Sequence, residues 1–338
     1  MNNSMEKAAH YPVSIAPMMD RTDRYYRYMM RLISQKVLLY TEMITTKAIL
    51  RGDRERLLLY HPDEHPISLQ VGGDDPDELA AVAIIAEDWG YDEININVGC
   101  PSSRVQSGRF GACLMRRPDV VAEAVQRMKS VCSIPVTVKH RIGVDEIDRY
   151  EDMRNFVVCV SKSQADRFSV HARKAWLQGL SPKENRNIPP LRYEDVYRLK
   201  KEHCDLQIEI NGGICSYEQM DTHLRYVDAV MLGRAAYDNP WLFSQVDQRY
   251  FGAESRDITR VEVAFLMLPY IARHLESGGK MMTVTRHMLN LFKGVPGGRR
   301  WRRELGTLSA KGRSDIKAVE DLIRSFEGTG YLEQEGLR

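Results

Sequence analysis

The chain has 338 residues, of which 43% are hydrophobic and 28% are charged, and its formal net charge is +2. This composition excludes intrinsic disorder, and the length suits one large barrel with an appendage. The six cysteines form no C-x-x-C pair, which excludes a zinc knuckle, and we expect no metal site. The start, MNNSMEKAAHYP, lacks the apolar core of a signal peptide, and no apolar run could span a membrane. We therefore expect a cytoplasmic protein, and a monomer.

Short β-rich runs alternate with longer helical patterns along the first two thirds of the chain, which predicts repeated βα units around a parallel sheet. The predicted strands are Val13–Ala16, Val37–Thr41, Ile67–Gln70, Glu93–Val98, Pro135–Lys139, Arg167–Val170, Gln207–Ile210 and Asp228–Leu232. Helical patterns between them include Asp77–Trp89, Asp119–Ser130, Asp148–Ser163 and Tyr217–Tyr226. Eight such units favour an α/β fold of the closed (β/α)₈ TIM-barrel type, with a doubly wound open sheet as the alternative.

The strand pattern stops after Pro240, and the remaining sequence predicts helices only. The candidates are Ile258–Glu276, Thr283–Phe292 and Ser314–Phe326, the last beginning with a Ser-Asp cap. We therefore expect a barrel domain over residues 1–245 and a helical domain over 246–338. The segment Lys280–Arg313 carries nine Lys or Arg residues against one acidic residue, which indicates a polyanionic partner.

In such barrels the reactive groups lie at the carboxyl ends of the strands, because the βα loops form one shared mouth. Nearly every predicted strand delivers a polar or reactive group there. In chain order these are Pro17, Met18 and Met19, then Gln70, Asn97 with Cys100, Lys139, His171, Asn211 with Gly212 and Gly213, and Gly233 with Arg234.

The ends of the last two strands indicate a phosphate site. Glycines there let backbone N–H groups approach an anion, and Arg234 adds a charged donor. Either motif alone, Gly212-Gly213 or Gly233-Arg234, would be read as a tight turn, but the two at consecutive strand ends favour a phosphate. If that phosphate belongs to flavin mononucleotide (FMN), Lys139 and His171 could face the pyrimidine side of the ring, and Gln70 could bond its edge. The flavin interpretation depends on all of these residues together, because a lone Lys or His is usually a solvated or structural group.

Cys100 directly follows a strand, so we expect its thiol to point into the mouth of the barrel. It could be a nucleophile, a redox sensor, a proton donor or inert packing. A nucleophile needs a base, and the sequence pairs Cys100 with neither His140 nor His171. A proton donor needs only a thiol that is still protonated near neutrality, as an ordinary cysteine is.

Several long motifs resemble those of the tRNA-dihydrouridine synthase family. They are APMMD, YTEMI, SLQVGG, YDEININVGCPSSRVQSGRFGACLM, VTVKHRIG, VHARKAWLQGLSPKENRNIPPL, EINGGI and MLGRAAYDNPW. The cysteine-containing run, the SPKENR segment and HMLNLFKGVPGGRRWRREL are most similar to the A subfamily. The resemblance extends from about Val13 to Leu305.

This resemblance implies an FMN-containing barrel with a helical RNA-binding domain that uses NADPH to reduce a D-loop uridine of tRNA (U20 or U20a). It implies that Cys100 protonates C5 of uracil after hydride reaches C6. The residues that it places at FMN are Pro17, Met18, Met19, Gln70, Lys139, His171, Asn211, Gly212, Gly213, Gly233 and Arg234. Those that it places at the substrate or the tRNA are Asn97, Lys183, Arg186, Arg299 and Arg302.

Two other functions stay open at this point. A flavin barrel acting on a free pyrimidine would explain the flavin residues but not the basic helical segment. A tRNA chaperone with an inert barrel would be colourless and would not consume NADPH. The segment Arg299–Arg303 could grip phosphates or stack on bases, or it could be a solvated helix face with Trp301 buried.

Overall fold

The computed structural model describes residues 11–310 and 315–327. Some of the predictions above fall outside these ranges. They concern the first ten residues, and also Lys311, Arg313 and Ser314. The strands are β1 (Val13–Ile15), β2 (Leu39–Tyr40), β3 (Ile44–Thr45), β4 (Ile67–Gly72), β5 (Glu93–Val98), β6 (Val136–Arg141), β7 (Arg167–His171), β8 (Ile208–Asn211) and β9 (Ala229–Leu232).

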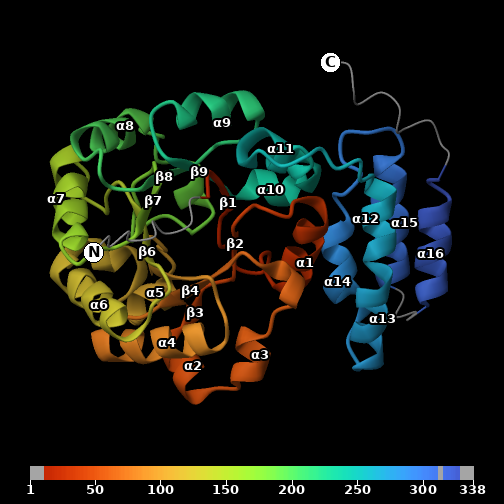
Figure 1. Ribbon diagram of the computed structural model, residues 1–338, viewed down its shortest axis with the longest axis horizontal. Coiled ribbons are helices and arrows are strands. Elements are labelled where there is room, and N and C mark those ends of the chain that lie inside the picture. The colour runs from red at the N-terminus through yellow and green to blue at the C-terminus, as the bar shows by residue number, and fades with distance from the viewer. Residues whose placement is uncertain (1–10, 311–314, 328–338) are drawn as a thin grey trace, which may run out of the picture. The chain divides into compact units, whose positions relative to one another are not determined.

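The strands form one parallel sheet that closes into a barrel (Figure 1). Its order is β1-β9-β8-β7-β6-β5-β4-β2, and the short β3 pairs with β4 outside this path. A parallel bridge between Ser14 and Leu38 joins the two ends of the sheet, and the N–H of Ile15 donates to Leu38 O at 2.9 Å. All eight predicted barrel strands are present, so the predicted (β/α)₈ barrel is confirmed and the open sheet is excluded.

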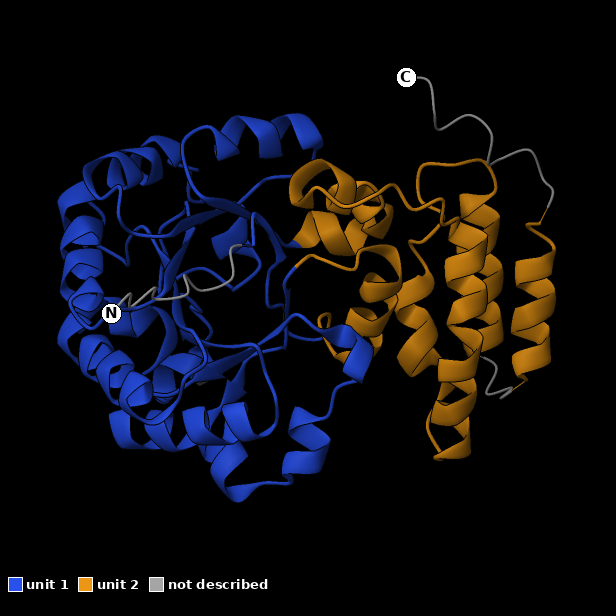
Figure 2. Cartoon of the chain, viewed as in Figure 1, with its two compact units in different colours: residues 1–20, 38–233 blue, residues 21–37, 234–338 orange. Residues whose placement is uncertain are grey.

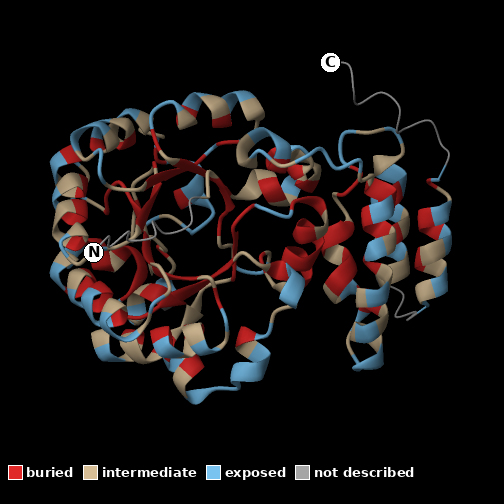
Figure 3. Ribbon diagram, viewed as in Figure 1, coloured by how far each residue is buried: buried red, intermediate tan, exposed pale blue. Residues whose placement is uncertain are grey.

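Alternation along the strands places apolar and polar side chains on opposite faces of the sheet. Ile94, Ile96 and Val98 of β5 are buried, whereas Glu93, Asn95 and Asn97 join a polar network with the neighbouring strands. Deep in the barrel Arg167 contacts Glu93 at 2.5 Å and Glu209 at 3.7 Å. The barrel strands are almost entirely buried (Figure 3), so this ion pair has lost its water and depends on its partners.

Helices surround the barrel (Figure 1). They are α2 (Thr46–Arg51), α3 (Arg54–Leu58), η1 (Pro62–Glu64), α4 (Pro76–Asp88), α5 (Ser103–Ser107), η2 (Gly111–Arg116), α6 (Pro118–Val131), α7 (Tyr150–Ser161), η3 (Glu184–Arg186), α8 (Tyr193–Glu202) and α9 (Tyr217–Leu224). Local sequence sets their starts. At α4 the Asp75 carboxylate accepts the N–H groups of Asp77 and Glu78, and Pro76 occupies the first turn. Such a cap stabilises a helix by about 1 kcal/mol.

The chain divides into two compact units (Figure 2). The barrel unit runs to Asp20 and from Leu38 to Gly233, and the helical unit comprises Arg21–Val37 and the chain from Arg234 onward. The helical unit contains α1 (Arg24–Ile33), α10 (Arg234–Asp238), η4 (Pro240–Phe243), α11 (Val246–Phe251), α12 (Arg260–Leu266), α13 (Leu268–Glu276), α14 (Met281–Met288), α15 (Gly298–Ala310) and α16 (Ile316–Arg324). The boundary predicted after residue 245 separates a barrel domain from a helical domain by function as well as by packing. That boundary stays a prediction.

The helical unit differs from its prediction in more than one element: α15 was not among the predicted helices, and one predicted helix is divided. The sequence predicts a single helix over Ile258–Glu276, but the structure has α12 and α13 with a break at Met267. Pro269 stands in the first turn of α13, where its missing N–H costs nothing, whereas inside one helix it would break a hydrogen bond. The core of this unit contains Trp301, Phe292 and Phe326, whose rings contact one another.

Helix α1 packs with the helical unit, although it follows the first barrel strand in the chain. The rings of Tyr28 and Tyr270 stack at 4.3 Å. The Asp23 carboxylate caps α1 and pairs with Arg286 at 2.6 Å and with His287 at 3.0 Å. Although burial opposes it, the hydrogen bond and charge of His287 lower the pKa of Asp23. These contacts tie α1 to α14.

Candidate active site

Hydrogen bonds between polar side chains join the carboxyl ends of barrel strands in two pairs, β4 with β5 and β6 with β8. Asn97 Nδ2 on β5 donates to Gln70 Oε1 on β4 at 2.8 Å. Lys139 Nζ on β6 donates to Asn211 Oδ1 on β8 at 3.2 Å. Asn211 Nδ2 in turn donates to the carbonyl oxygen of Met231 on β9 at 2.8 Å. The structure therefore brings these four predicted site residues to one rim of the barrel.

Cys100 lies two residues after the end of β5 and is partly exposed. Its backbone N–H donates to Asn97 Oδ1 at 2.9 Å, and the N–H of Gly99 donates to the same oxygen at 3.1 Å. Its Sγ lies 3.5 Å from Ser102 Oγ. Asn97 thus caps the end of β5, and the chain then turns so that the thiol is accessible rather than sealed in the core.

Arg141 anchors the Cys100 loop and was not singled out from the sequence. Its Nε donates to Gly99 O at 2.8 Å, and its Nη1 donates to the carbonyl oxygens of Lys174 and Asn185 at 3.0 and 3.1 Å. Burial lowers the pKa of Arg141 to about 10, whereas the charge of Cys100 acts in the opposite direction. One buried guanidinium therefore ties the Cys100 loop to the loop over residues 174–185, close to the thiol.

Lys139 is a cation in a place that disfavours charge. Burial and, to a smaller extent, the charge of Arg141 lower its pKa to about 8, although the charges of Glu209 and Cys100 act in the opposite direction. Such a perturbed group at a barrel mouth is typical of a functional site. An anionic ligand placed here would favour the charged form.

The glycines after β8 form a tight cradle. Gly212 has φ +124° and Gly213 has φ +76°, both in the region that favours glycine. A Cβ on Gly212 would lie 2.8 Å from Leu191 Cδ2 and 2.9 Å from His171 Cδ2. After β9, a Cβ on Gly233 would lie 3.7 Å from Met18 Sδ. Close-packed glycines beside a lysine and amide donors fit the phosphate and ring of a flavin.

The two candidate histidines lie on opposite faces of the sheet. His171 ends β7 in register with Asn211, on the rim that carries Lys139 and Gln70. His140 packs outward against Phe156 at 5.0 Å between ring centroids, and burial lowers its pKa to about 4. Strand alternation therefore excludes His140 as a base for Cys100.

The remaining predicted site residues are exposed or partly exposed. Met19 is 54% exposed and Pro17 and Met18 are partly exposed at the end of β1. Lys183 and Arg186 are exposed at η3, the short helix held by Arg141 through Asn185. In the helical unit Arg234 begins α10, and Arg299 and Arg302 are exposed on α15.

Trp301 settles one alternative for the arginine segment. It is fully buried, and its Nε1 donates to Met288 O at 2.8 Å. The suggestion that this segment stacks on bases is therefore wrong for Trp301. The periodicity of the helix directs the Trp301 side chain into the core, whereas the neighbouring arginines are exposed. The part of α15 that can meet a polyanion is its charged face.

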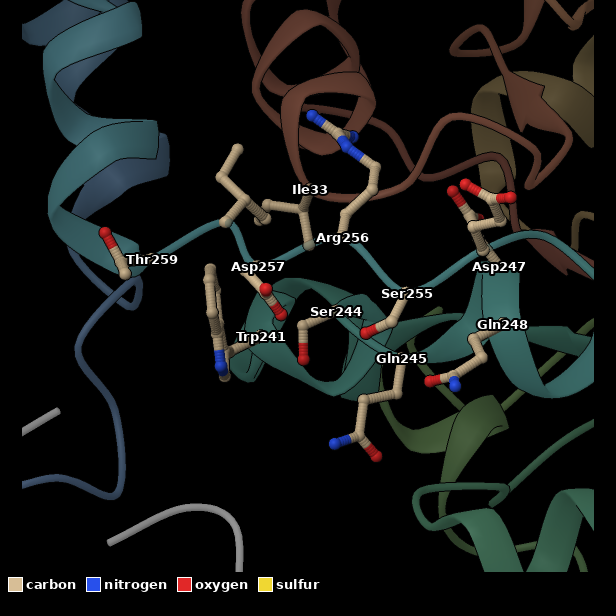
Figure 4. A pocket seen from close by; sticks show the side chains of 12 residues that line it. Ile33, Trp241, Ser244, Gln245, Asp247, Gln248, Ser255, Arg256, Asp257 and Thr259 are labelled. Carbon is tan, nitrogen blue, oxygen red and sulfur yellow. The ribbon is translucent and has the colours of Figure 1, made fainter. Parts of the chain in front are cut away.

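A cavity of about 300 Å³ lies in the helical unit beside α11 (Figure 4). It is lined by Ile33, Trp241, Ser244, Gln245, Asp247, Gln248 and the segment Glu254–Thr259. None of the predicted site residues lines it. The Asp247 carboxylate already accepts from Ser34 Oγ and from the N–H groups of Gln35 and Lys36, which indicates a structural role.

Sequence reasoning missed the buried polar residues below the rim. Asn95 and Thr137 lie on β5 and β6 and bond each other at 2.8 Å. The available signal was their spacing, because Asn95 stands two residues before Asn97 and Thr137 two residues before Lys139, on the same faces. Arg141 stands two residues after Lys139 and could have been found in the same way.

These features define a (β/α)₈-barrel protein with a cationic rim that can accept an anion and an accessible thiol. The family profile of the dihydrouridine synthases (Dus) matches residues 14–327. The tRNA-dihydrouridine(20/20a) synthase of Synechocystis is 59% identical over 95% of this chain and 96% of that protein. The enzymes of the same name from Shewanella oneidensis and Escherichia coli K12 are 55% and 52% identical, over 93% and 92% of this chain and 93% and 90% of theirs. The chain belongs to the dihydrouridine synthase family.

A solved structure of a 2-naphthoyl-CoA reductase complex is similar in fold alone. The TM-score is 0.54 at 8% sequence identity, and the match covers 70% of this chain and 50% of that one. It supports the barrel architecture. Among the residues that the structure describes, no helix is long and apolar enough to cross a membrane.

Proposed function

We propose that this chain is a tRNA-dihydrouridine synthase that reduces the C5=C6 bond of a D-loop uridine at position 20 or 20a, with FMN as cofactor and NADPH as reductant. The observation that carries the proposal is the accessible thiol of Cys100 on a loop held by Asn97 and Arg141, beside the cationic rim. Flavin-dependent reduction is the chemistry of the family to which the chain belongs. The relatives named above act on tRNA by their names.

The rim supplies the groups that would hold the flavin. Lys139, His171 and Gln70 would orient its ring, and Asn211 holds Lys139 Nζ in place. Gly212, Gly213, Gly233 and Arg234 would receive the phosphate, and Pro17, Met18 and Met19 would lie against the ring. When bound and reduced, the flavin supplies the hydride that adds to C6 of uracil. A charged Lys139 stabilises the negative charge that reduction creates.

Cys100 would act as the general acid, because addition of hydride at C6 leaves C5 in need of a proton. The thiol would give its proton to C5 and become a thiolate. That thiolate forms near Arg141 and Lys139, whose charges interact favourably with it. Asn97 and Arg186 would contact the base, which must leave its stack to reach a barrel mouth. Lys183, Arg299 and Arg302 would bind tRNA phosphates.

The test is direct reduction by the purified protein. With FMN, NADPH and unmodified tRNA, we expect dihydrouridine at position 20 or 20a, mapped by mass spectrometry of nuclease fragments. Turnover of a free pyrimidine without product in tRNA would favour a free-pyrimidine dehydrogenase. Colourless protein that binds tRNA but never consumes NADPH would favour the chaperone. A monomeric, cytoplasmic enzyme is part of the proposal, and sedimentation and cell fractionation test it.

A further inference from the structure

Five hydrogen bonds run in one direction through the barrel, from the backbone N–H of Cys100 to the carboxylate of Glu93. Cys100 N donates to Asn97 Oδ1 at 2.9 Å. Four links of 2.8 Å follow: Asn97 Nδ2 to Gln70 Oε1, Gln70 Nε2 to Asn95 Oδ1, Asn95 Nδ2 to Thr137 Oγ1, and Thr137 Oγ1 to Glu93 Oε1. We call this series the Glu93–Cys100 chain.

The direction of the chain is fixed at both ends. A backbone N–H can only donate, so Asn97 must present Oδ1 to Cys100 and Nδ2 to Gln70. At the other end Glu93, paired with Arg167 at 2.5 Å, can only accept, so the Thr137 hydroxyl must donate to it. The alternative acceptor of that hydroxyl, Ile94 O, is farther away at 3.5 Å. Each carboxamide between the ends therefore has one allowed orientation.

Burial makes this orientation costly to change. Asn95 and Thr137 are 0% exposed, Gln70 is 1% exposed and Glu93 is 2% exposed, so water cannot replace a lost partner cheaply. A link removed at Thr137 leaves the Asn95 amide without its acceptor. The disturbance reaches Gln70 and Asn97 because each amide in the series is oriented by the next.

We propose that Asn95 and Thr137 are positioning residues for the reaction, which hold the carboxamides of Gln70 and Asn97 and, through Asn97, the Cys100 loop in a single orientation. This inference rests on the proposed function, in which those three residues face flavin and uracil. Within the chain, Gln70 and Asn97 each use one amide hydrogen and keep a second. The groups that they offer at the rim are donors, which suit the carbonyl oxygens of isoalloxazine and uracil.

The structure provides a matched pair of variants. Thr137 Oγ1 and Ser68 Oγ both donate to Glu93 Oε1, at 2.8 and 2.9 Å, and both residues are fully buried. Only the Thr137 hydroxyl also accepts from Asn95. Thr137→Val therefore breaks the chain, whereas Ser68→Ala removes an equivalent bond to the same carboxylate and leaves the chain intact. Thr137→Ser keeps the hydroxyl and should restore it.

The measurements are amide hydrogen exchange at Gly99 and Cys100 in the flavin-loaded protein, its flavin absorbance, and kcat for uridine reduction. For Thr137→Val we expect exchange at these two amides to be faster and kcat to be lower, each on the order of tenfold, with flavin retained. Ser68→Ala and Thr137→Ser should match the wild type. Equal effects of Thr137→Val and Ser68→Ala, or wild-type exchange in Thr137→Val, would overturn the inference.

Two further arms keep the outcome readable. If Thr137→Val alone does not fold, Asn95→Leu with Thr137→Val removes the orphaned Asn95 amide and breaks the chain one link nearer to Cys100, at Gln70. This double variant should also give faster exchange at Gly99 and Cys100, and wild-type exchange there would overturn the inference. Exchange that responds as expected in a protein that reduces no uridine would uphold the positioning of the loop and reject the proposed function instead.

Discussion

Asn97 Oδ1 accepts the backbone N–H of Cys100 at 2.9 Å, so the last inward side chain of β5 fixes the loop that carries the thiol. Arg141 holds the same loop from β6 through Gly99 O. Two rigid strands therefore position the thiol, as an acid that must meet a bound ring requires.

Cys100→Ala should abolish most uridine reduction while flavin and tRNA binding persist. Loss of a general acid costs roughly 10²–10⁴ in rate, because the proton must then come from water. The measurement is single-turnover reduction of tRNA uridine by the prereduced protein, with flavin content followed by absorbance. Cys113→Ala, at another partly buried cysteine, is the control and should leave the rate unchanged. An unaltered rate in Cys100→Ala would remove the acid role.

Lys139→Met should stabilise the flavin-free protein at pH 7 and weaken its flavin binding. The pKa of Lys139 is lowered from 10.5 to about 8, so the folded state holds this proton less well than the unfolded state. That penalty is complete below pH 8 and disappears between about pH 8 and 10.5. It amounts to about 3 kcal/mol, and the lost bond to Asn211 offsets about 1 kcal/mol of the gain.

Urea unfolding at pH 7 and pH 9.5 measures this difference. The stability advantage of Lys139→Met over wild type should be about 2 kcal/mol at pH 7 and smaller at pH 9.5. Lys162→Met, at an exposed lysine that ends α7, is the control and should change little at either pH. The assignment of a desolvated cation is contradicted if Lys139→Met is equally destabilising at both pH values.

Gly212→Ala should destabilise the barrel and weaken flavin binding. Its φ of +124° strains an added side chain, and the new Cβ would press on Leu191 and His171 at less than normal contact. Gly179→Ala is a matched control, because Gly179 also has positive φ, +81°, but nothing lies within 4 Å of its added Cβ. We expect about 1 kcal/mol for Gly179→Ala and at least 2 kcal/mol for Gly212→Ala. Flavin titration should show weaker binding for Gly212→Ala alone.

Reversing the charge of Arg299 and Arg302 to Glu should weaken tRNA binding and reduce its salt dependence. Both side chains are exposed on α15, and each phosphate contact contributes about 0.7–0.9 to the slope of log K against log salt. Filter binding across a salt series would measure that slope. Arg127→Glu, at an exposed arginine of α6, controls for the charge change of a single reversal at Arg299 or Arg302. Unchanged affinity and slope would make the arginines of α15 structural.

The sequence alone determined the barrel and the identity of most rim residues. Period-two apolar runs end in Gln70, Asn97, Lys139, His171 and Asn211, and parallel strands bring their carboxyl ends together. It also placed Cys100 just after a strand and indicated the basic helical segment. These are local signals, because strand ends and helix faces follow from a few neighbouring residues.

Only the tertiary structure decided which side chains hold one another. The Glu93–Cys100 chain joins residues from three strands, and the Arg141 guanidinium reaches carbonyl oxygens on two loops. The break between α12 and α13 and the packing of α1 with the helical unit were likewise decided there. Contacts between segments far apart in the chain depend on burial and on the satisfaction of hydrogen bonds across the whole barrel, which no local pattern encodes.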